Sequence, residues 1–107
     1  MQNTSNSKFF DDVLAPSYAT PVVVMFHASW CGPCKSMKPL MERLAGSRFH
    51  LVGVDGGTER DLAASEGVRG VPAILVYRDG KQVGDSLFGG KTEAQVLAFL
   101  AAAGVPT

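Results

Sequence analysis

The sequence predicts an α/β fold in which a mixed central sheet of about four strands carries helices on both faces. Strand-like apolar runs alternate along the chain with segments of helical periodicity, which is the pattern of a βαβ unit with parallel strands. Asp79-Gly80 separates two strand-like runs, a strong hairpin signal that adds antiparallel strands. Val22–Ala28 is β-branched and apolar without alternation, which favours a central strand buried on both faces.

The expected elements of the first half are a helix over Ser7–Leu14, the strand Val22–Ala28, a helix from about Pro33 to Ala45 and a strand over Arg48–Asp55. Apolar residues recur at helical spacing in both helices. Pro33 suits the first turn of the second helix, where a missing N–H costs nothing, and Gly46 is placed to end that helix. Two prolines favour a loop over Ala15–Pro21.

The expected elements of the second half are a helix from Thr58 to about Glu66, strands over Ala73–Tyr77 and Gln82–Phe88, and a last helix that ends at Ala103. Thr58 is placed to N-cap the first of these helices. Thr92 and Gln95 have the spacing of a capping box for the last helix.

Length and composition predict a single domain over residues 1–107, with residues 1–6 flexible. The chain has zero formal net charge and no basic or acidic block, which argues against electrostatic binding to nucleic acid or to an anionic membrane. The longest apolar run, Pro21–Phe26, is too short to cross a bilayer, and Met1–Lys8 lacks the apolar core of a signal peptide. We therefore expect a monomer in the cytoplasm, or in the periplasm if a leader has been removed.

The chain has two cysteines, Cys31 and Cys34, which stand where the central strand meets the start of a helix. Helix N-termini carry unpaired N–H groups and a partial positive charge, and both stabilise a thiolate. We expect Cys31 to have the lower pKa and the greater exposure, and Cys34, one turn into the helix, to be more buried. The two-residue spacing brings the sulfurs within bonding range.

This arrangement predicts thiol–disulfide exchange. Cys31 attacks a substrate disulfide and forms a mixed disulfide, and Cys34 then attacks the Cys31 sulfur and releases the reduced substrate. Pro33 stiffens the turn between the two cysteines. The oxidised pair must be reset by a separate reductant, so we expect no cofactor beyond the Cys31–Cys34 disulfide.

Two other interpretations of the cysteine pair are weaker. Half of a zinc site would need two further ligands, and besides carboxylates only His27 and His50 are available. His50 lies on a different predicted strand with no second ligand beside it, so we expect no metal. A purely structural disulfide is weakly motivated, because closing so short a loop constrains the unfolded chain little.

The six residues from Trp30 to Lys35 read Trp-Cys-Gly-Pro-Cys-Lys and are similar, residue for residue, to the active-site motif of the thioredoxin family. Pro39 stands where the family has a proline inside the active-site helix, and Gly70-Val71-Pro72 resembles the loop before its third main strand. The resemblance extends from about residue 9 to residue 100. Phe26, Ala28, Asp55, Gly80 and Gly89 also fall at family-like spacings, Gly89 after a one-residue insertion.

The resemblance implies a protein-disulfide reductase that acts on disulfide-containing proteins and receives electrons from a thioredoxin reductase or an equivalent donor. It also implies a cis bond between Val71 and Pro72, with the Val71 backbone beside Cys31 and ready to pair with an extended substrate segment. The implied substrate-docking residues are Trp30, Gly32, Pro33, Gly70, Val71, Pro72 and Gly89. Trp30, Gly32, Pro33, Lys35 and Pro72 are also expected to support the cysteines.

The sequence departs from the family at three positions near the cysteines. Met25 replaces the usual buried aspartate, Leu51 the usual lysine, and His27 the usual tryptophan or other aromatic. Met25 and His27 share one strand face. We hypothesise that His27 supports catalysis by moving a proton to and from Cys34, because histidine titrates near neutral pH. The alternative is that His27 packs in place of an aromatic ring, hydrogen-bonded to backbone.

The family has a strand before its first helix, but here only the polar segment Met1–Ser7 precedes Phe9, so we expect the N-terminal edge strand to be missing or vestigial. The missing acid keeps a second function open, that of a pathway-specific or envelope oxidoreductase with few partners. A non-catalytic binding module is disfavoured by the intact Cys31–Cys34 pair.

Overall fold

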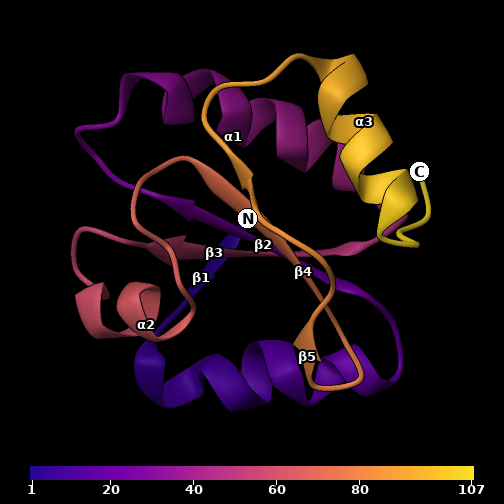
Figure 1. Ribbon diagram of the computed structural model, residues 1–107, viewed down its shortest axis with the longest axis horizontal. Helices are drawn as coiled ribbons and strands as arrows, with labels where there is room; N and C mark the ends of the chain where they lie inside the picture. Colours follow the sequence, from indigo (N-terminus) through magenta and orange to yellow (C-terminus); the bar gives the residue numbers. More distant parts are fainter.

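The computed structural model describes residues 1–107 as one mixed sheet with helical segments on both faces (Figure 1). The strands are β1 (Gln2–Thr4), β2 (Val22–His27), β3 (His50–Asp55), β4 (Ala73–Arg78), β5 (Lys81–Gln82) and β6 (Leu87–Phe88). The α-helices are α1 (Gly32–Ala45), α2 (Arg60–Ser65) and α3 (Glu93–Ala102). Short 3₁₀ or π turns cover Asn6–Lys8, Phe10–Leu14 and Pro16–Tyr18.

Strand β2 lies at the centre of the sheet, whose order is β1-β3-β2-β4-β5, with β6 also paired to β4. β1 and β2 run parallel to β3, whereas β4 is antiparallel to β2, β5 and β6. Every residue from Val22 to Phe26 is fully buried. The mixed α/β architecture and the central position of β2 are therefore confirmed.

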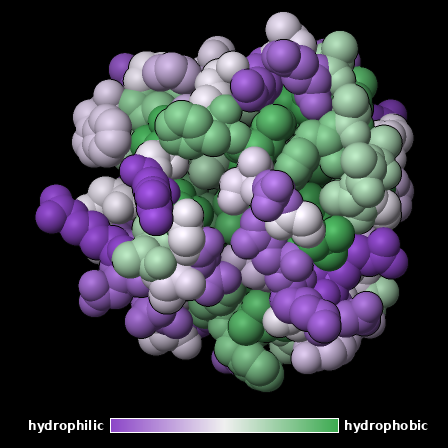
Figure 2. Space-filling model, in the orientation of Figure 1, coloured by the Kyte–Doolittle hydropathy of each residue, from purple (hydrophilic) through white to green (hydrophobic).

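The two faces of the sheet carry separate cores. α1 and α3 cover one face, where Met25, Met41 and Leu100 pack, and the N-terminal helical turns and α2 cover the other, around Phe26 and Leu75 (Figure 1). The outer side of α3 is mostly alanine and gives the apolar surface seen over that helix in Figure 2. Fully burying one large apolar side chain contributes about 1.5–3 kcal/mol. The two cores thus fix β2 and the point where it passes into α1.

The sheet has six strands where the sequence predicts about four. The N-terminal edge strand is present, although it is only three residues long, and it pairs Gln2 with Val52, Asn3 with Gly53 and Thr4 with Val54. Part of the segment 1–6, expected to be flexible, therefore belongs to the sheet. A short polar edge strand has no hydrophobic pattern to detect, because its backbone N–H and C=O groups carry the pairing.

Two predicted elements are irregular. The strand predicted over Gln82–Phe88 is split into β5 and β6, because the chain leaves the sheet at Gly84, whose φ is +66°. The helix predicted over Ser7–Leu14 consists of 3₁₀ and π turns, with the Ala15 N–H bonded to the Phe10 carbonyl.

The capping box of α3 is confirmed: the Thr92 hydroxyl accepts from the Gln95 N–H, and the Gln95 side chain accepts from the Thr92 N–H. The N-cap predicted at Thr58 is wrong. α2 begins two residues later at Arg60, and the Thr58 hydroxyl donates to the Asp55 carbonyl instead.

The two threonines provide a matched test of these caps. Thr92→Ala removes a capping hydrogen bond and should lower the free energy of unfolding by about 1 kcal/mol. Thr58→Ala removes no cap and should lower it by less than about 0.5 kcal/mol. Urea unfolding followed by circular dichroism measures both values, and equal losses would contradict the assignment.

Candidate active site

The two cysteines lie where β2 ends and α1 begins. Cys31 is the N-cap residue of α1, with an extended backbone, and its sulfur accepts a hydrogen bond from the Cys34 N–H at 3.2 Å. The sulfurs are joined in a disulfide, with the two Cα atoms 5.3 Å apart. The C-x-x-C spacing therefore forms the predicted pair at the predicted helix start.

The predicted difference in exposure between the cysteines is absent. Cys31 and Cys34 are each 4% exposed, because the disulfide holds both sulfurs against the same apolar cluster. Cluster members from β2, the turn after it and α1 include Met25, Ala28 and Met37. The oxidised pair is thus shielded from solvent over most of its surface.

The rest of the motif is exposed around this shielded disulfide. Trp30 is 73% exposed, and Gly32 and Pro33 also reach the surface. Lys35 is exposed on α1 and forms no ion pair. The motif thus presents an apolar surface beside the disulfide, together with the positive charge of Lys35.

The loop before β4 lies against the same site. The Val71–Pro72 peptide bond is cis, as the resemblance implies. Ala73, the next residue, pairs with Phe26 near the end of β2, and Val71 packs against the cluster that holds both cysteines. Pro72 is buried, and its carbonyl accepts the Gly89 N–H at 2.8 Å.

This hydrogen bond holds Gly89 beside Pro72, together with a neighbour, Gly90, that the sequence did not single out. A Cβ atom on Gly90 would lie 3.5 Å from the Pro33 Cβ atom, so the Gly89-Gly90 turn closes against the motif. Gly89 has a φ of +90°, a conformation that favours glycine. In the sequence, the only signal for Gly90 is that it belongs to a glycine pair directly after a predicted strand.

Side chains beneath the cysteines are apolar. Met25 is fully buried in the cysteine cluster, and Leu51 is half-buried against it. No Asp, Glu, Lys, Arg or His residue of the chain is buried. No buried acid or base therefore takes the place of the acid–base pair that these positions usually hold in the family.

His27 ends β2 and bonds to a residue of β1. Its Nε2 atom lies 3.0 Å from Asn3 Oδ1, and the Asn3 side chain reaches it across Gly53 of β3. A Cβ atom on Gly53 would lie 2.3 Å from that oxygen and 3.2 Å from His27 Nε2, so the bond requires a glycine there. The packing interpretation expected His27 to be hydrogen-bonded to a backbone group. Its partner is instead the side chain of Asn3.

Burial lowers the pKa of His27 below its ordinary value of 6.5. The carboxylate of Asp55, opposite His27 in the sheet register, acts in the other direction, and Lys38 on α1 adds to the lowering. The lowered pKa favours the neutral imidazole over the charged one.

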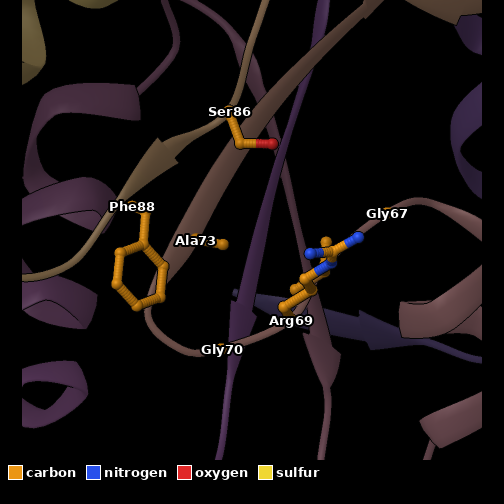
Figure 3. A pocket seen from close by; sticks show the side chains of 7 residues that line it. Gly67, Arg69, Gly70, Ala73, Ser86 and Phe88 are labelled. Carbon is orange, nitrogen blue, oxygen red and sulfur yellow. The ribbon is translucent and has the colours of Figure 1, made fainter.

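Two hollows are lined in part by the loop that leads to Pro72. One, of about 230 Å³, is lined by Trp30, Gly56, Arg60, Ala63, Ala64, Val68, Arg69, Gly70 and Val71. The other, of about 290 Å³, is shown in Figure 3 and is lined by Gly67, Val68, Arg69, Gly70, Ala73, Ser86 and Phe88. In that view the Phe88 ring and the Arg69 side chain lie on opposite sides of Ala73.

A disulfide at the start of a helix, on this fold, defines a thiol–disulfide oxidoreductase whose redox group is the cysteine pair itself. The sequence model of the family described as Thioredoxin matches residues 1–102, and the chain belongs to that family. No helix is long and apolar enough to cross a membrane. No group of three or more His, Cys, Asp or Glu side chains is placed to hold a metal ion.

Named relatives agree with this assignment. The chain is 35% identical to thioredoxin C-2 of Corynebacterium nephridii over 92% of its own length and 91% of that protein. It is 40% identical to the mitochondrial thioredoxin of Mus musculus, of which it spans 60%. In structure it is similar to a single-residue mutant of thioredoxin from Halobacterium salinarum NRC-1, with a TM-score of 0.81 and 27% identity over 95% of this chain and 88% of that one. As a member of this family with an intact C-x-x-C pair, the chain is a protein-disulfide reductase.

The charges around His27 can be tested by NMR titration of its imidazole. In the unmodified protein the pKa should lie below 6.5. Asp55→Asn removes a charge that raises the pKa and should lower it further, whereas Lys38→Gln should raise it. Shifts in the same direction for both variants would contradict the arrangement.

Proposed function

We propose that Cys31 is the nucleophile and Cys34 the resolving cysteine in the reduction of protein disulfides. The observation that carries this proposal is the hydrogen bond from the Cys34 N–H to the Cys31 sulfur at the N-cap of α1. In the reduced protein the same N–H group and the helix dipole favour the Cys31 thiolate.

The reaction proceeds by two exchanges. The Cys31 thiolate attacks one sulfur of the substrate disulfide, that S–S bond breaks, and the departing substrate thiolate takes up a proton. Cys34 then loses its proton and attacks the Cys31 sulfur, which releases the second substrate thiol. Two electrons pass from the cysteine pair to the substrate, and Cys31 and Cys34 end as a disulfide.

The substrate docks on the residues that surround Cys31 and Cys34. Trp30, Gly32 and Pro33 offer an apolar surface, and the loop through Gly70, Val71 and Pro72 lies beside it, next to Gly89. An extended substrate segment could pair with the Val71 backbone as an added strand. This mode places a disulfide of the segment over Cys31.

The electron donor of this cycle is a thioredoxin reductase or an equivalent enzyme, which returns Cys31 and Cys34 to the dithiol form. We assign the protein to the cytoplasm and expect a monomer. Membership of the family and the bacterial thioredoxin relatives favour a general protein-disulfide reductase over a pathway-specific oxidoreductase.

The roles of the two cysteines are separable by substitution. Cys34→Ser should accumulate a mixed disulfide with insulin, because the nucleophile remains and the resolving thiol is gone. Cys31→Ser should trap none. Each variant should lower insulin reduction, driven by a thioredoxin reductase, by more than about 100-fold. Non-reducing electrophoresis detects the adduct, and the double Cys→Ser variant is the control. Trapping by Cys31→Ser alone would reverse the two roles.

His27 remains a candidate for proton transfer to and from Cys34. Its Nε2 atom is engaged by Asn3, which supports the packing role instead. We therefore expect His27→Phe to leave the rate of disulfide reduction and its dependence on pH between 5 and 8 unchanged within about twofold. Stopped-flow rates across that range measure the profile. Loss of a titration step near neutral pH would assign proton transfer to His27.

A further inference from the structure

We propose that the hollow beside Trp30 is a subsite for an acidic side chain of the substrate, with Arg60 and Arg69 supplying the complementary charge. The inference rests on the proposed function, because it assigns a substrate preference to that same reaction. It concerns the residues that flank the disulfide in the substrate, and not the exchange itself.

The hollow is open to a substrate that reaches the disulfide. It lies between Trp30 of the active-site turn, α2 and the loop that ends at Val71. Its volume of about 230 Å³ is several times the roughly 30 Å³ that one water molecule occupies in the liquid. It can therefore receive a side chain of the size of glutamate.

The charged side chains that line this hollow are all positive. Arg60 and Arg69 are its only charged lining residues, and both are exposed. Neither forms an ion pair: the two ion pairs of the chain join the N-terminal amine to Glu42 and Arg43 to Glu93. Two uncompensated guanidinium groups thus border an otherwise apolar hollow.

The nearby carboxylates have other hydrogen-bond donors. Asp55 accepts from the Gly57 N–H at 2.9 Å, Glu59 accepts from the Asn6 N–H at 2.7 Å, and Glu66 accepts from the Tyr77 hydroxyl. Asp61 is exposed on α2 and does not line the hollow. A carboxylate from outside the chain is therefore the group that the hollow best complements.

Arg60 is also held in place. Its Nε–H donates to the Gly57 carbonyl at 3.3 Å, and a Cβ atom on Gly57 would lie 3.6 Å from Trp30 Nε1. The base of the Arg60 guanidinium is thus tied to the turn that contacts Trp30. This reduces the side-chain entropy that a carboxylate partner would have to remove on binding.

A substrate strand paired with Val71 would present successive side chains to opposite sides of the loop. The hollow of Figure 3 shares Val68, Arg69 and Gly70 with this one, but Phe88 and Ser86 line it in place of Arg60 and Trp30. Because only the Trp30 side has two cations, the acidic preference is assigned to that side.

The test uses disulfide-linked peptides that carry glutamate, glutamine or lysine at one of the two positions on either side of the cysteine. Pre-reduced protein reacts with each peptide at pH 7 and low salt, and chromatography gives the rate constant. Each rate is divided by the rate with dithiothreitol, which corrects for the effect of the charge on the peptide's own reactivity. At one position or more, the normalised rate for the glutamate peptide should exceed that for the glutamine peptide by about threefold to tenfold. The normalised rate for the lysine peptide should be lower than that for the glutamine peptide.

Matched variants connect this preference to the two arginines. The double variant Arg60→Gln/Arg69→Gln should bring the glutamate-to-glutamine ratio close to one. Arg48→Gln makes a charge change of the same kind before β3, at the far end of that strand from Asp55, and should keep the ratio. Added KCl at about 0.5 M should reduce the ratio in the unmodified protein, because salt screens exposed charges.

Equal normalised rates for glutamate and glutamine at every position in the unmodified protein would overturn the subsite. So would a preference that survives in the double variant. Because these results come from ratios among peptides that are all reduced, they leave the proposed function intact. Failure to reduce any peptide would instead contradict the proposed function, and the subsite with it.

Discussion

The hydrogen bond between the Cys34 N–H and the Cys31 sulfur depends on β2 delivering Cys31 to the first turn of α1. β2 can do so because it is buried between two cores, one under α1 and α3 and one under α2 and the N-terminal turns. The same packing keeps the N-terminus of α1, with both cysteines, against the apolar cluster that includes Met25. The packing of the sheet thus sets the electrostatics of the cysteine pair.

Side chains contribute little charge beneath that pair. With Met25 in the cysteine cluster, Leu51 packed against that cluster and no buried acid or base, the thiols lie between two opposing influences. Burial favours the neutral thiol, whereas the helix N-terminus favours the thiolate. The helix N-terminus acts most directly on Cys31, because Cys31 is the N-cap residue. This difference between the two cysteines favours Cys31 as the nucleophile and Cys34 as the resolving cysteine.

The surface around the disulfide joins segments that are far apart in the chain. Pro33 meets Gly90, the Pro72 carbonyl holds Gly89, and Trp30 borders a hollow with two arginines. A fold shared with many relatives does not by itself fix what a site prefers, because preference comes from the side chains around it. In this chain those side chains are apolar next to the disulfide and cationic on the side of α2.

Local patterns in the sequence were sufficient to predict β2, the start of α1 at Cys31 and the cap at Thr92. Burial patterns, cysteine spacing and capping each depend on only a few neighbouring residues. The edge strand β1 and its bond from Asn3 to His27 were decided only by tertiary structure. A polar edge strand has no periodic signal, and its partner lies many residues away. Backbone hydrogen bonds to β3 supply the pairing there, and they leave no trace in side-chain composition.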